Sequence, residues 1–143
     1  MKHEFNEVLK DLMIETNTTS QKLAKEIGVS DVTVNRWKSG NISDLFLSRL
    51  VMLGNYFQCT LDYLIGRTDN HKKPSKTSIG NFGESVRAMM KSKGITTYQI
   101  RKQTKFGGNH FHDWDNGADP KLETLLDLAN YFNCSLDELV GLE

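Results

Sequence analysis

The chain contains an internal repeat. The segment Asn55–Gly66, NYFQCTLDYLIG, recurs 75 residues later as Asn130–Gly141, NYFNCSLDELVG. Upstream of these segments the matching residues lie 77 apart, as for Trp37 and Trp114. Because repeated sequence generally folds into repeated structure, the chain is expected to contain two similar units. Any fold assigned to one unit must therefore be compatible with the other.

The spacing of the repeat also locates a boundary. It changes between Gly40 and Leu47, which places a two-residue insertion in the first copy. The stretch between the copies is polar and basic and holds one of the two prolines, as is typical of a linker. We therefore predict a first domain at 1–69, a linker at 70–80 and a second domain at 81–143.

Both copies have the periodicity of helices. Apolar residues recur at positions i, i+4, i+7 and i+8, which form one stripe of a helix, and no run alternates with period two. In the first copy this stripe consists of Phe5, Leu9, Leu12 and Met13; in the second it consists of Phe82, Val86, Met89 and Met90. The pattern predicts an all-α chain of two tandem five-helix domains.

Local signals predict where the helices begin and end. Thr19 and Ser30 stand where N-caps are expected, and Gly28 is a natural C-terminal stop. The fourth helix is expected to run from Asp44 to Phe57. In the second copy, Pro120 fits the first position of the equivalent helix. Ser135 and Glu138 have the spacing of a capping box at the last helix.

Composition excludes several classes of protein. The 143 residues are 38% hydrophobic and 25% charged, as in an ordinary globular protein. No apolar run approaches the roughly 18 residues of a membrane span, and the segment Met1–Glu7 lacks the apolar core of a signal peptide. Two cysteines are too few for a disulfide scaffold. These features predict a cytoplasmic protein with no membrane partner.

The charge balance argues at first against nucleic acid. There are 18 basic and 18 acidic residues, whereas nucleic-acid binders usually carry a basic excess. The charges are unevenly divided, however: residues 1–70 hold 8 basic and 9 acidic residues, residues 71–78 hold 3 and none, and residues 79–143 hold 7 and 9. Local basic patches can therefore still meet phosphates.

Two segments of the first copy carry a family resemblance. Leu23–Gly40, LAKEIGVSDVTVNRWKSG, resembles the helix-turn-helix of the lambda repressor/Cro-type family, and Cys59–Gly66 resembles that family's last helix. The resemblance covers residues 3–69 and, less closely, 79–142. It implies double-stranded DNA as partner and a transcriptional regulator, namely a repressor of phage or mobile-element type that acts as a homodimer.

The resemblance also assigns site residues. Val29, Val34 and Trp37 are expected to hold the third helix against the core, which leaves its other face exposed. In the family, the first, second and sixth residues of that helix read base edges. These positions correspond to Asp31, Val32 and Arg36. Additional DNA or phosphate contacts are expected from Thr19, Ser20, Gln21, Thr33, Asn35, Lys38, Ser39 and Asn41. One departure is that Ser20 stands where the family usually has Gln.

The second copy differs at these same positions. Lys105 replaces Gly28, Gly108 replaces Asp31 and Asp113 replaces Arg36. We therefore expect a remodelled turn, a poorly nucleated third helix and no reading of the major groove. Its outer face would carry Asn109, His110, His112, Asp113 and Asp115. This copy is expected to serve in dimerisation or in auxiliary contacts. An alternative form of this hypothesis is that both copies bind the same DNA as a pseudo-dimer.

Other functions have less support. His110 and His112 are two residues apart and diverge on a helix, so no metal site is expected, and no cofactor motif is present. Cys59 and Cys134 are expected to fill equivalent core positions. No catalytic motif points to an enzyme. The alternative from another class is an antitoxin-like or inhibitory regulator that binds a protein, and the zero net charge favours it.

Overall fold

The computed structural model describes residues 4–143, so residues 1–3 of the N-terminal segment discussed above lie outside it. The described residues form ten helices and no strand. The chain divides into two compact units, Met1–Ser75 and Lys76–Glu143. The division falls inside the predicted linker 70–80. Within the described range, no helix is long and apolar enough to cross a membrane.

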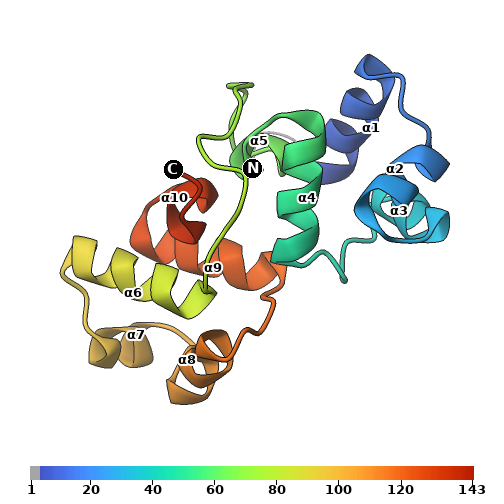
Figure 1. The fold of residues 1–143 in the computed structure, drawn as a ribbon. Coiled ribbons are helices and arrows are strands. Elements are labelled where there is room, and N and C mark those ends of the chain that lie inside the picture. Colours follow the sequence, from blue (N-terminus) through green and yellow to red (C-terminus); the bar gives the residue numbers. More distant parts are fainter. Residues whose placement is uncertain (1–3) are drawn as a thin grey trace. The chain divides into compact units, whose positions relative to one another are not determined.

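The first unit is a five-helix domain, shown in blue to green in Figure 1. Helix α2 packs against α3, α1 contacts α3 and α5, and α4 contacts α2 and α5. Trp37, Leu9 and Leu50 are completely buried at the centre. The helices are α1 (Phe5–Glu15), α2 (Ser20–Ile27), α3 (Asp31–Lys38), α4 (Leu47–Phe57) and α5 (Leu61–Leu64).

Local chemistry explains the turn between α2 and α3. The side chains of Thr19 and Ser30 cap the two helices by accepting a hydrogen bond from the backbone N–H of the third residue of each helix. Gly28 ends α2 with φ of 72°, in the left-handed region that residues with a Cβ disfavour. These three predictions are confirmed.

Two predicted helix starts were wrong. Helix α4 begins at Leu47 rather than Asp44, because Asp44 lies in the preceding turn, where its carboxylate is bound by other side chains. Helix α9 (Leu122–Phe132) begins two residues after Pro120, which is buried in the loop before it. In both copies, therefore, the loop after the third helix is longer than the sequence indicated.

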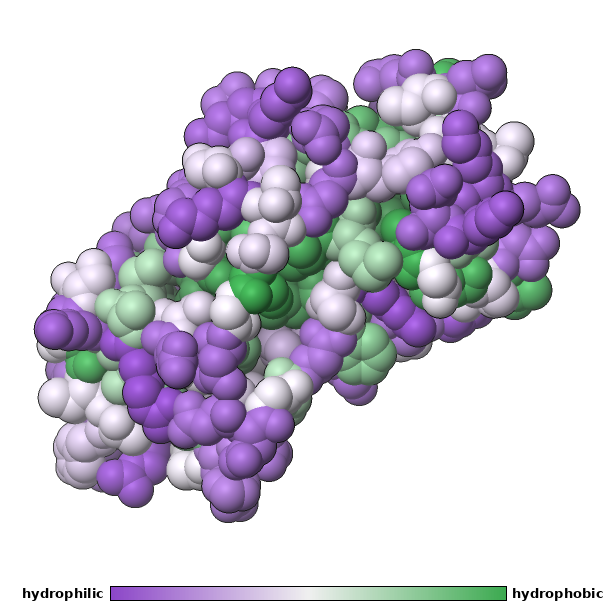
Figure 2. Space-filling view, in the orientation of Figure 1, coloured by the Kyte–Doolittle hydropathy of each residue, from purple (hydrophilic) through white to green (hydrophobic). Residues whose placement is uncertain are grey.

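The second unit repeats the first. Helix α8 packs chiefly on α6, and α10 packs on α6 and α9. Trp114 and Cys134 are buried, as are Trp37 and Cys59 in the first unit, which confirms their prediction as core residues. The remaining helices are α6 (Phe82–Lys93), α7 (Thr97–Gln103), α8 (Gly108–Asp115) and α10 (Leu136–Val140). Hydrophilic side chains cover much of the visible surface of both units (Figure 2).

The turn before α8 departs from the repeat. Helix α7 ends at Gln103, and Thr104 is extended with φ of −134° instead of adopting a left-handed cap. The remodelled turn is thus confirmed. The expectation of a weak third helix was wrong: α8 has eight residues, as α3 has, and the Gly107 N–H donates to His110 Nδ1 at 3.1 Å. That bond satisfies the N–H of the N-cap residue itself, whereas Ser30 in the first unit accepts from the N–H of Thr33 inside the helix.

Candidate nucleic-acid interface

The outer face of α3 is exposed where the sequence placed its base-reading residues. Asp31 and Val32 begin the helix, and 63% of Val32 is accessible although the residue is apolar. On the opposite face, Val34 and Trp37 are completely buried. Because the buried face fixes the helix rotationally, the exposed face has a defined direction and can present side chains to a ligand.

Arg36 lies on the same helix but is not free. Its Nη2 donates to Asp44 Oδ2 at 2.6 Å and to Thr33 Oγ1 at 3.3 Å. Asp44 also accepts from Trp37 Nε1 at 2.9 Å and from Arg49 Nη1 at 3.1 Å. Burial raises the pKa of Asp44, but the hydrogen bonds from Trp37 and Arg36 and the two positive charges outweigh it, so that its pKa is lowered.

Thr33 was expected among the residues that contact DNA from the exposed face of α3, but it does not lie on that face. Thr33 is only 9% exposed, and its hydroxyl lies 3.0 Å from that of Ser30. A short polar side chain in the first turn of a helix can bond back to the cap, and here that bond turns Thr33 away from solvent. It supports Arg36 from behind and offers no surface to a ligand.

A chain of hydrogen bonds joins α2 to α3. Lys38 Nζ donates to Ser20 Oγ at 3.2 Å, and Ser20 Oγ donates to Asn35 Oδ1 at 2.9 Å. Three of the predicted phosphate-contact residues are thus brought together at the start of α2. Ser20, the departure from the family pattern, takes over a connection between the two helices through its hydroxyl.

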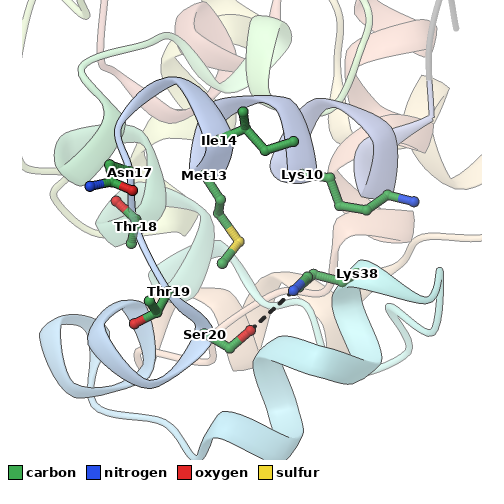
Figure 3. A pocket seen from close by; sticks show the side chains of 8 residues that line it. All are labelled: Lys10, Met13, Ile14, Asn17, Thr18, Thr19, Ser20 and Lys38. Atoms are coloured by element: carbon green, nitrogen blue, oxygen red, sulfur yellow. Dashed lines mark hydrogen bonds between the residues drawn. The ribbon is translucent and has the colours of Figure 1, made fainter.

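Beside this chain lies an open groove of about 440 Å³ between α1 and the ends of α2 and α3. Figure 3 shows Met13 pointing into it from α1, with Lys38 bonded to Ser20 on the other side. Lys10, which was not among the predicted contacts, is also on its wall. Its match 77 residues later is Arg87, so a basic residue at the same place in both copies was the available signal. The groove is lined by Lys10, Met13, Ile14, Asn17, Thr18, Thr19, Ser20 and Lys38.

The remaining predicted contacts lie around the same surface. Thr19 is exposed and uses its hydroxyl as the cap of α2, and Gln21 is exposed beside it. Ser39 Oγ donates to the Asn35 carbonyl at 3.0 Å. Asn41 Oδ1 accepts from Ser43 Oγ at 3.1 Å. Ser39 and Asn41 thus follow the C-terminal end of α3, whereas Thr19 and Gln21 flank the start of α2.

Comparison with known families shows to which family the chain carrying this surface belongs. A family profile described as the Cro/C1-type HTH DNA-binding domain matches residues 8–70 and again residues 85–143. The chain belongs to this family. No curated protein and no solved structure matches it. The predicted resemblance, the two tandem copies and the all-α fold are confirmed, and the match supports a DNA-binding regulator.

The second Cro/C1-type domain presents a different surface. On α8, Asn109, His112 and Asp113 are exposed, as expected. Asp115 forms an ion pair with Arg87 of α6, and its backbone carbonyl accepts from Asn81 Nδ2 at 2.9 Å. The position that Lys38 occupies in the first domain is therefore acidic here, and its charge is used within the domain.

In the part of the chain that the structure describes, no three His, Cys, Asp or Glu side chains lie close enough together to hold a metal ion. His110 Nδ1 accepts from the Gly107 N–H. In the Cro/C1-type domains of this chain the polar clusters are therefore hydrogen-bond and ion-pair networks between helices.

Proposed function

We propose that the chain is a sequence-specific DNA-binding transcriptional repressor of phage or mobile-element type, in which the first domain reads the major groove with α3. The observation that carries this is the exposed face of α3, with Asp31, Val32 and Arg36 beside the polar start of α2. We expect it to act in the cytoplasm, without a cofactor and without catalysing a reaction.

The three reading residues have complementary chemistry. An arginine pairs with guanine, an apolar side chain contacts the thymine methyl, and a carboxylate accepts from cytosine N4. These roles are proposed for Arg36, Val32 and Asp31 respectively. The exposure of Val32 supports its role, because an apolar side chain left in water gains when it contacts a methyl group.

Phosphate contacts are proposed along the groove. Lys38 and Lys10 supply positive charge, and the start of α2 supplies backbone N–H groups and a favourable dipole. Ser20, Thr19 and Gln21 flank this helix start, and Asn35, Ser39 and Asn41 follow on the α3 side. Such contacts fix the register of the protein on the duplex and leave the sequence to be read by α3.

The second domain is proposed to dimerise the protein. A single small reader has limited affinity, so two readers are expected on half-sites about 34–36 Å apart. Charge within this domain is sorted: residues 82–105 hold six basic residues and one acidic residue, whereas residues 106–143 hold one basic and eight acidic residues. Oppositely charged regions of that kind can pair between two subunits. Sedimentation of the full chain, with and without a selected duplex, tests the stoichiometry.

The reading role is tested by selection and substitution. Duplexes bound by the full chain are selected from a random pool, and Arg36→Ala is then assayed on the selected site. We expect it to cost about 1–3 kcal/mol and to relax one base position. Asp113→Ala, at the equivalent position of α8, is the matched control and should leave the affinity unchanged. Equal binding by wild type and Arg36→Ala would refute the assignment.

A second candidate, a regulator that binds another protein, is favoured by the balance of 18 basic and 18 acidic residues. Near-neutral proteins gain little from counterion release on DNA. Recovery of a stoichiometric protein partner in a pull-down, in the absence of any salt-dependent DNA affinity, would support this candidate over the first.

A further inference from the structure

Asp44 is the centre of a network that joins the loop after α3 to α3 and α4. It accepts from Arg36 and Trp37 of α3 and from Arg49 of α4. Arg49 Nη1 also donates to the backbone carbonyl of Asp44 at 3.1 Å. The loop is thereby held through both the side chain and the backbone of Asp44.

The repeat supplies an internal comparison for this network. Asp113 stands in place of Arg36, and Thr124 stands in place of Arg49. The loop itself is two residues shorter in the second copy. Both arginines and the longer loop are therefore absent from the same copy, although the buried tryptophan that they surround is present as Trp114. The carboxylate itself recurs as Asp119 at the 75-residue spacing, so the first copy differs in the two arginines placed around it. A carboxylate beside the buried tryptophan is thus common to both copies, whereas its pairing with Arg36 belongs to the first alone.

We propose that Asp44 is a positioning residue for Arg36, which sets how strictly the first domain discriminates its DNA sequence. The inference rests on the proposed function. Asp44 and Thr33 bind only Nη2 of the guanidinium. Within residues 4–143, Nη1 and Nε of Arg36 keep their hydrogens for an acceptor outside the protein. The side chain is held in place but remains 37% exposed.

The physical basis is preorganisation. A free arginine has many rotamers and loses that freedom when it binds a base, whereas a side chain already fixed loses less. Arg49 maintains the arrangement, because it binds Asp44 and its guanidinium carbon lies 5.9 Å from the ring centres of Trp37 and Phe46. The three side chains of the ion-pair network are between 26% and 37% exposed, so the network lies at the protein surface beside α3.

Two effects of Asp44 on DNA binding have opposite signs. Its negative charge opposes binding to any phosphate backbone, so removal of the charge strengthens binding to every sequence. The bond from Asp44 to Arg36 favours one base over the others, so removal of this bond weakens discrimination between DNA sequences. A residue that only stabilised the fold would change neither the ratio of the two affinities nor its dependence on Arg36.

The test compares Asp44→Asn with wild type on the selected duplex and on a random duplex. Asparagine keeps an oxygen for Trp37 Nε1 but loses the charge that holds Arg36. We expect the ratio of the two affinities to fall about tenfold, within the range of one base contact, while binding to the random duplex does not weaken. In the Arg36→Ala background the same substitution should leave the ratio unchanged.

Asp62→Asn is the matched control. It removes the same charge and breaks a comparable ion pair, with Arg67 at 3.1 Å, on α5. Its ratio should equal that of wild type. Arg49→Gln is a second test that leaves the Trp37–Asp44 bond intact, and it should lower the ratio in the same direction.

The outcomes separate the inference from the function on which it rests. If wild type selects no sequence, the proposed function fails. If wild type selects a sequence but Asp44→Asn discriminates as well as wild type or better, then Asp44 does not position Arg36 and the inference is overturned. A fall that persists in the Arg36→Ala background would overturn it as well.

Discussion

The two domains share a fold but differ in how their second and third helices are held. Helix α2 buries Leu23, Ala24 and Ile27 and packs chiefly on α3. Helix α7 buries only Ile100 among its residues, and α8 packs chiefly on α6. The same frame can therefore keep its core while the helix-turn-helix pair itself is loosened. The second domain thus retains the fold of the first without the close packing of its second helix on its third.

The charges at the third helix sharpen the contrast. Lys10 and Lys38 both lie on the groove of the first domain. Their equivalents, Arg87 and Asp115, form an ion pair with each other. In one domain the two positive charges thus line an open groove, whereas in the other the same two positions tie α6 to α8.

The largest expected effect comes from making the first domain resemble the second at this position. Lys38→Asp should weaken DNA binding roughly 100-fold, since like charges at a phosphate contact cost several kcal/mol. The slope of log affinity against log salt should become shallower by about one, because one phosphate contact is lost. Fluorescence anisotropy of a labelled duplex at several salt concentrations measures both quantities.

The reverse change, Asp115→Lys, is the control for that prediction. It breaks the ion pair with Arg87, which is about half exposed and contributes at most about 1 kcal/mol. DNA affinity should not fall. An equal loss in both variants would mean that the two domains contact DNA alike.

A smaller effect is expected at the turn glycine. Gly28→Ala forces a Cβ into a backbone with φ of 72°, which costs about 1–2 kcal/mol of unfolding free energy. Lys105→Ala, at the equivalent turn, should cost less, because that turn has no left-handed residue. Each domain contains one tryptophan, so urea unfolding followed in Trp114→Phe and in Trp37→Phe backgrounds reports each domain separately. Equal losses would contradict the remodelled turn.

Local stability should differ between α2 and α7. Because α7 buries a single apolar side chain, its backbone hydrogen bonds should open more readily than those of α2. We expect amide hydrogen exchange in residues 97–103 to be several-fold faster than in residues 20–27. Similar protection of the two segments would show that packing of the second helix does not distinguish the domains.

The smallest effect concerns acid. The pKa of Asp44 is lowered, so its ionised form stabilises the first domain above its ordinary pKa near 3.8, and this stabilisation is lost as the pH falls. Backbone and side-chain bonds from Ser135 likewise lower the pKa of Glu138 in the second domain. Asp44→Asn and Glu138→Gln should each destabilise their own domain at pH 7, with a gap from wild type that narrows toward pH 3. A gap independent of pH would exclude the charge as its cause.

The parts of the fold that could be predicted are local ones. The caps at Thr19 and Ser30 and the stop at Gly28 depend on a few neighbouring residues, and all were found in the sequence. Thr33 was misplaced because a helix pattern gives the direction of a side chain but not its back-bond to Ser30. Networks that join distant segments, such as Arg87 with Asp115, depend on tertiary packing, which periodicity does not contain.

Asp44 shows the same limit at the site. The insertion in the first copy was visible in the sequence, but Asp44 was predicted to begin the fourth helix rather than to lie in the loop before it. Only the folded loop brings it to Arg36, Trp37 and Arg49. The repeat nonetheless held the signal, because the insertion and the two arginines occur together in one copy.

The central claim is that only the first domain reads DNA sequence. It is tested most directly by repeating the selection from a random pool with two variants of the full chain, Val32→Ala/Arg36→Ala on α3 and Asn109→Ala/Asp113→Ala on α8. We expect the α3 variant to lose or change the selected sequence while the α8 variant retains that of wild type. An unchanged sequence from the α3 variant, or a changed one from the α8 variant, would contradict it.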